Sequence, residues 1–88
     1  NLLRPDRLLL LEEGLEVFRV AVPPPLAHHS LRENRIRERT GSSVVAIKSK
    51  HALTLNPDPG SVLREGDELI LIGGSEAETT FLQHYGAR

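Results

Sequence analysis

The sequence predicts an α+β domain in which two short helices cover a four-stranded, mostly antiparallel sheet, preceded by an N-terminal linker helix. Apolar runs of strand length recur along the chain, and proline or glycine bounds them. Two segments also begin with a serine that a glutamate follows three residues later, which is the pattern of a helix capping box. With 88 residues, the chain is long enough for one small domain.

Residues 1–14 are predicted to form a linker helix from a preceding domain. Six leucines occur in the first 13 residues, and Pro5 suits the first turn of a helix. So many leucines cannot all face solvent on one helix of a monomer, so this helix is expected either to pack on a second subunit or to belong to a preceding domain. Gly14 ends the helix, and residues 15–88 form the folded domain.

The first strand is predicted over residues 15–22, where Phe18, Val20 and Val22 share one face of an alternating pattern. The prolines at residues 23–25 end this strand, because proline lacks the N–H group that a strand ladder needs.

A helical segment is expected to follow the first capping box at residues 30–33. On one straight helix Leu31 and Ile36 would point about 140° apart, so a single helix could not bury both. We therefore expect a break near Asn34 and Arg35 that leaves two short helical turns.

The rest of the chain is predicted to form three strands and a final helix, with Gly41 ending the preceding helical segment. The second capping box, at residues 75–78, opens the final helix, and Gly73 and Gly74 are interpreted as turn residues before it. The first two of these strands form a hairpin, and the third is expected to be central and covered on both faces. The predicted strands span residues 43–48, 51–55 and 68–72.

Composition excludes several classes of function. The net charge of −1 provides no global field toward nucleic acid, and the few aromatic residues do not flank the basic ones, so no nucleic-acid partner is predicted. The absence of cysteine excludes thiolate metal sites and cysteine nucleophiles. No catalytic residue is predicted, because neither a nucleophile elbow nor a spaced carboxylate pair is present.

The clearest indication of a function is a local cluster of arginines. Residues 31–40 hold four arginines against two glutamates. Guanidinium groups bind phosphate or carboxylate through paired hydrogen bonds, although a solvated face with ion pairs along the helix explains the same pattern. Arg37 is expected to be the exception, because it directly follows the apolar Ile36 and so starts from a partly buried position.

The four histidines do not predict a metal site. His28 and His29 are adjacent, but a transition-metal site needs three or four ligands, and only His51 and His84 remain to complete one.

An ordered series of residues resembles the C-terminal lobe of RCK (regulator of conductance of potassium) domains, also called TrkA-C. The resemblance covers roughly residues 15–86, and residues 1–11 resemble the helix that links such lobes to a Rossmann nucleotide-binding domain. The series consists of Ser30, Leu31, Ile36, Arg37, Glu38, Thr40, Gly41, Val44, Val45, Ala46, Ile47, Asn56, Pro57, Asp58, Pro59, Leu63, Gly66, Asp67, Leu69, Ile70, Leu71, Ile72 and Gly73.

This resemblance implies a cytoplasmic, membrane-associated regulatory domain that pairs with a second copy and controls a potassium channel or transporter. It also implies a ligand site at the dimer interface for cyclic di-AMP or another small anionic ligand, and no cofactor or metal. Arg37 matches the arginine that meets a phosphate, Ser43 and Val44 match residues that line the base and ribose, and Pro59 matches a proline wall, with Ile36 beside them.

Some positions depart from the family, and two alternatives stay open. His28 and His29 stand where relatives commonly carry glycine and lysine, and Ser43 replaces the asparagine of nucleotide-binding members. One alternative function is a purely structural domain that assembles subunits. The other is the regulatory lobe of a different cation antiporter or permease.

Overall fold

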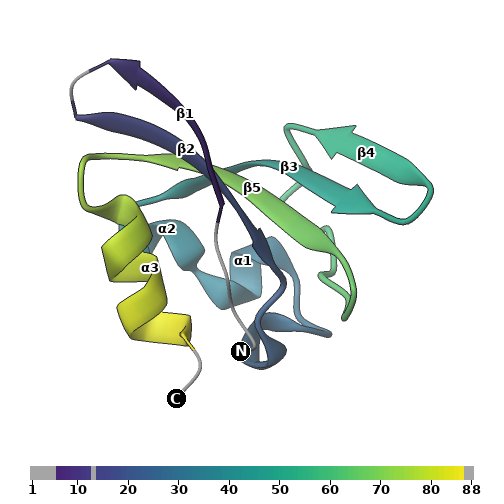
Figure 1. Cartoon of the computed structure of the whole chain (residues 1–88). Helices are drawn as coiled ribbons and strands as arrows, with labels where there is room; N and C mark the ends of the chain where they lie inside the picture. Colours follow the sequence, from purple (N-terminus) through teal and green to yellow (C-terminus); the bar gives the residue numbers. More distant parts are fainter. Residues whose placement is uncertain (1–5, 13, 87–88) are drawn as a thin grey trace.

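The computed structural model describes residues 6–12 and 14–86, which form a five-stranded sheet with its helices on one face. The strand order is β1-β2-β5-β3-β4, and every neighbouring pair is antiparallel (Figure 1). The strands are β1 (Asp6–Glu12), β2 (Leu15–Ala21), β3 (Ser43–Ser49), β4 (Ala52–Leu55) and β5 (Glu68–Gly73). The helices are the 3₁₀ turn η1 (Pro24–Leu26), α1 (Leu31–Asn34), α2 (Ile36–Thr40) and α3 (Ala77–Tyr85).

The predicted α+β class and the antiparallel pairing of the four strands after residue 14 are confirmed, and β1 adds a fifth strand to the sheet. The hairpin is also confirmed, although β4 begins one residue later than expected, at Ala52. β5 is central, as predicted, with strands on both sides. Its two faces differ, because Leu69 and Leu71 are fully buried while Ile70 and Ile72 are only half-buried.

The predicted N-terminal helix is wrong over residues 6–12, which form β1 and pair with β2. Residues 1–5 and 13 of that helix lie outside the described residues. A short apolar run such as residues 8–11 does not distinguish a strand from a helix by its periodicity. Gly14, at φ 85°, provides the tight reversal after β1, so the run pairs with β2 as the first half of a hairpin.

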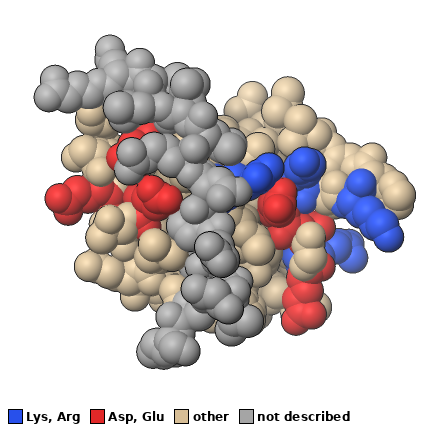
Figure 2. Space-filling model, in the orientation of Figure 1, with Lys and Arg blue, Asp and Glu red and all other residues tan. Residues whose placement is uncertain are grey.

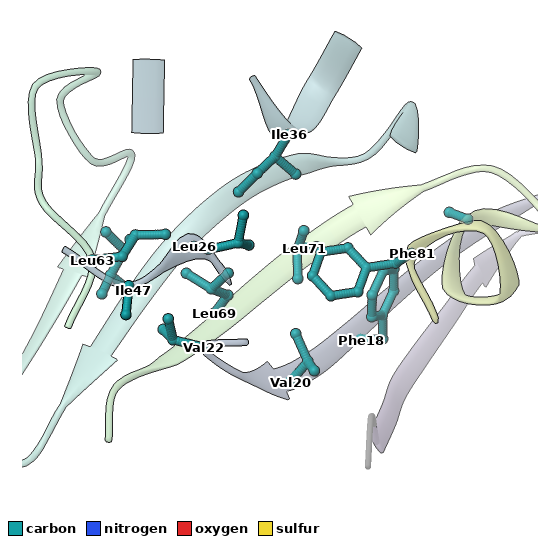
Figure 3. Packing of buried hydrophobic residues seen from close by; sticks show 12 residues of the cluster. Phe18, Val20, Val22, Leu26, Ile36, Ile47, Leu63, Leu69, Leu71 and Phe81 are labelled. Atoms are coloured by element: carbon teal, nitrogen blue, oxygen red, sulfur yellow. The ribbon is translucent and has the colours of Figure 1, made fainter. Parts of the chain in front are cut away.

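The hydrophobic core lies between the helices and one face of the sheet. Phe18 and Val20 of β2 are buried against this layer, as the alternating pattern predicted, together with Leu69 and Leu71 of β5 (Figure 3). The other buried members of the cluster are Val22, Leu26, Ala27, Ile36, Ile47, Leu63, Ala77 and Phe81.

The first capping box and the helix break are both present. The Ser30 hydroxyl accepts a hydrogen bond from the Glu33 N–H, and the Glu33 carboxylate accepts one from the Ser30 N–H. Arg35 then adopts the left-handed conformation, with φ 51° and ψ 44°, and separates α1 from α2. The buried Asn34 side chain holds this joint by donating to the Leu26 carbonyl at 2.9 Å.

The second capping box does not form. α3 begins at Ala77 with Glu76 as its N-cap, and no side chain caps it. The Ala77 N–H already donates to the Gly74 carbonyl at 3.0 Å. This backbone turn places the helix start beyond Ser75, so the serine is too early in the chain to act as the cap.

Candidate functional site

A pocket of about 370 Å³ opens where α1, α2, the start of β3 and the loop before residue 60 come together. This volume is within the range of about 300–1,000 Å³ that is usual for small-molecule sites. The pocket is lined by Leu31, Arg32, Arg35, Ile36, Arg37, Glu38, Ser42, Ser43, Val44, Pro57 and Pro59.

Backbone hydrogen bonds hold the proline loop against the helices. The Arg32 N–H donates to the Pro59 carbonyl at 2.9 Å, and the Leu31 N–H donates to the Ser61 carbonyl at 2.9 Å. These bonds attach the proline loop to α1, so both contribute lining residues to the same pocket.

The structure brings all five predicted ligand-binding residues to this one pocket. Ile36 is buried and Val44 is partly buried against the core, so they form its apolar base. Ser43 lies at the first position of β3, and Pro59 lies in the loop that is hydrogen-bonded to α1. Whether these residues bind a ligand remains a prediction.

The expected partial burial of Arg37 is wrong, because its side chain is exposed. Successive residues of a helix point about 100° apart, so the inward direction of Ile36 turns Arg37 outward. An exposed guanidinium at the pocket wall is nevertheless free to meet a ligand without first leaving the core.

Two further arginines, Arg32 and Arg35, line the pocket and were not predicted as site residues. The same helix break that was inferred from Leu31 and Ile36 explains their position. A chain that changes direction at Arg35 places residues from both short helices along one wall. The sequence therefore indicated the position of Arg32 and Arg35 through the predicted helix break and not through a motif.

Glu33, the acidic residue of α1, already has polar partners. The hydrogen bond from the Ser30 backbone N–H lowers the pKa of Glu33, and the Nδ1 of His29 lies 3.8 Å from the same carboxylate. The Nε2 of His28 lies 3.9 Å from the Glu65 carboxylate. Both histidines are exposed, and no three potential metal ligands cluster within the described part of the chain.

Residues 15–85 match the TrkA-C domain family. "Probable potassium channel protein 2" of Methanocaldococcus jannaschii is 31% identical over 67 residues, which are 74% of this chain and 20% of that relative. The chain therefore spans about a fifth of the length of this curated relative. None of the described helices is long and apolar enough to cross a membrane.

Two solved structures have the same fold. The crystal structure of the GsuK RCK domain is 45% identical with a TM-score of 0.78, over 86% of this chain and 17% of that one. The RCK C domain of the potassium transport protein KtrA, in complex with cyclic di-AMP, is 26% identical with a TM-score of 0.71, over 77% of this chain and 80% of that one. The chain belongs to the TrkA-C domain family and is related to the RCK domains of potassium channels.

Proposed function

We propose that this domain is a cytoplasmic regulatory lobe that binds a small anionic ligand and thereby controls potassium transport through a membrane channel or transporter. The observation that carries the proposal is the convergence of Ile36, Arg37, Ser43, Val44 and Pro59 on one pocket. The related KtrA domain binds cyclic di-AMP, which makes this dinucleotide the first ligand to test.

Each wall of the pocket has a part in this binding. Arg37 meets a phosphate, for which its planar, permanently charged guanidinium is suited. Ser43 and Val44 line the base and ribose, and Pro59 and Ile36 add apolar lining. The role is binding and not catalysis, and it involves no metal or cofactor in this domain.

A second copy of the domain is the proposed partner. β4 is an edge strand, and its Leu53 and Leu55 are 56% and 67% exposed. An edge strand offers unpaired backbone groups, and its leucines add apolar surface that a symmetric partner would cover. A ligand in the pocket shifts the dimer only as far as it prefers one dimer geometry over another.

Two further partners are proposed because of the family to which the domain belongs, and the pocket gives no evidence for them. They are a preceding Rossmann nucleotide-binding domain and the membrane channel or transporter subunit. Nucleic acid is not proposed, because Phe18, Phe81 and Tyr85 pack against one another, away from the pocket.

Calorimetric titration of cyclic di-AMP tests the ligand site. Arg37→Ala is expected to weaken binding by about 10- to 100-fold, because it removes a charge-assisted contact to phosphate. Arg39→Ala is the matched control, since Arg39 is an exposed arginine on the same helix that does not line the pocket. Equal affinity of the wild type and Arg37→Ala would rule out the site.

Sedimentation measurements test the dimer. Leu55→Lys is expected to raise the dimer dissociation constant at least about tenfold, because a charge would replace apolar surface at the proposed contact. Gln83→Lys adds the same side chain at an exposed position of α3 and is expected to leave association unchanged. If both variants associate like the wild type, the contact does not involve β4.

The exposed leucines of β4 also favour a second function, a purely structural domain that assembles subunits and binds no small molecule. This alternative predicts a dimer whose melting temperature does not respond to nucleotides, because only a ligand that binds the folded state raises it. The regulatory lobe of another cation antiporter or permease would be distinguished by the membrane protein with which the domain acts and not by these residues.

A further inference from the structure

Three arginines face one pocket, and this concentration is larger than a single phosphate contact requires. Arg32, Arg35 and Arg37 line the pocket together with one acidic residue, Glu38, so the lining carries a net charge of +2. All three arginines are exposed, and none forms an ion pair within residues 6–12 and 14–86.

The nearest alternative explanation is that neighbouring carboxylates neutralise these arginines. Glu33 is the acidic residue between Arg32 and Arg35, but its carboxylate accepts the Ser30 N–H at 2.8 Å and lies 3.8 Å from His29. The hydrogen bonds of the capping box therefore hold Glu33 at the start of α1. The positive charge of the pocket wall remains available to a ligand.

The backbone conformation of Arg35 creates this arrangement. On one straight helix Arg35 and Arg37 would point about 200° apart, on opposite sides. The left-handed conformation at Arg35, with φ 51°, turns the chain so that both side chains and Arg32 line the same pocket. On the face drawn in Figure 2, basic and acidic side chains lie side by side over the half that carries β3 and β4.

We propose that this pocket binds a nucleotide with a linear chain of two or more phosphates, in which Arg37 holds one phosphate while Arg32 and Arg35 hold the next. The inference rests on the proposed ligand site and specifies its ligand class. Each phosphodiester of a cyclic dinucleotide carries a single negative charge, whereas a terminal phosphate carries about −1.5 to −2. Three guanidinium groups match the linear chain better.

The rest of the lining suits the nucleoside. Leu31, Ile36, Val44 and the two prolines provide apolar walls for a base, and the hydroxyl of Ser43 is a hydrogen-bond partner for a ribose. An inorganic phosphate chain would leave these apolar walls facing water, so the nucleoside is part of the recognised ligand.

The test is calorimetric titration of the 88-residue chain with adenosine diphosphate, tripolyphosphate and cyclic di-AMP, at one ionic strength. The variants are Arg32→Ala, Arg35→Asn and Arg37→Ala, with Arg39→Ala as the control. Asparagine is chosen at residue 35 because it tolerates the left-handed conformation. Circular dichroism of each variant verifies that the fold is retained.

Arg32→Ala and Arg35→Asn are each expected to lower the affinity for adenosine diphosphate about tenfold, and the affinity for cyclic di-AMP less than about threefold. Arg37→Ala should weaken both, and Arg39→Ala neither. If Arg32→Ala and Arg35→Asn leave the affinity for adenosine diphosphate unchanged while cyclic di-AMP still binds, this inference is overturned and the proposed function stays intact. Tripolyphosphate binding as tightly as adenosine diphosphate would overturn the nucleoside part. If no ligand binds, the inference and the proposed site both fail.

Discussion

Replacing Phe81 with alanine is expected to lower the free energy of unfolding by about 3–5 kcal/mol. The Phe81 side chain is fully buried, and its ring lies 6.0 Å from that of Phe18 in an edge-to-face arrangement and 5.0 Å from that of Tyr85. Truncation would leave a cavity between α3 and the sheet, and it would remove both ring contacts at once.

Chemical denaturation followed by circular dichroism measures this loss, at one protein concentration because association adds to apparent stability. Thr79→Ala is the matched control, since Thr79 is an exposed residue of the same helix and should change stability by less than about 0.5 kcal/mol. A Phe81→Ala variant as stable as the control would mean that α3 does not hold the sheet.

The sequence predicted most of the fold because its local signals and its packing agree. Alternation in β2 placed Phe18 and Val20 in the core, and Ser30 with Glu33 formed the capping box that the pattern indicated. The helix break was predicted from the directions of Leu31 and Ile36 alone. Each of these inferences depends on a period or a local hydrogen bond, which a sequence contains.

Two errors have physical causes that local patterns do not contain. β1 is a strand because β2 offers a partner edge, and pairing between segments overrides the helical preference of a leucine run. Ser75 does not cap α3 because a backbone turn at Gly74 delays the helix start until Ala77. In both cases a tertiary or backbone contact decided between two locally acceptable structures.

The candidate site was predictable in part. The resemblance placed Arg37, Ser43 and Pro59, and the structure brings them to one pocket. Arg32 and Arg35 were missed because the sequence pattern indicates that a helix breaks without giving the direction of the chain beyond the break. The left-handed geometry of Arg35 sets the direction of α2, and residues of both short helices line the same pocket.

Replacing Gly73 with alanine is expected to destabilise the domain by about 1–3 kcal/mol, the usual cost of overpacking. The sequence interpretation gave Gly73 as a turn residue, but it is the last residue of β5. Glycine is needed there because a side chain has no room. An added Cβ would collide with the Cβ of Ala77 and would lie 2.7 Å from the hydroxyl oxygen of Ser42. The Ser42 hydroxyl can rotate about the Cα–Cβ bond, but the Cβ of Ala77 is fixed to the backbone of α3, so α3 or the end of β5 would have to move.

Gly74→Ala separates this steric cause from a general loss of glycine flexibility. At residue 74 an added Cβ would lie 3.6 Å from the Gly14 carbonyl oxygen, which is ordinary contact, so a change in unfolding free energy below about 0.5 kcal/mol is expected in the same denaturation experiment.

A double-mutant cycle then identifies which neighbour the added Cβ of Gly73→Ala meets. Ala77→Gly removes the Cβ that collides, so the double variant with Gly73→Ala should be less destabilised than the sum of the two single variants. Additive losses of stability would mean that the strain does not come from Ala77, and the hydroxyl of Ser42 would be the next contact to remove.

Because Ser42 also lines the pocket, its displacement in Gly73→Ala is expected to weaken ligand binding as well, which connects the packing of α3 to the proposed site.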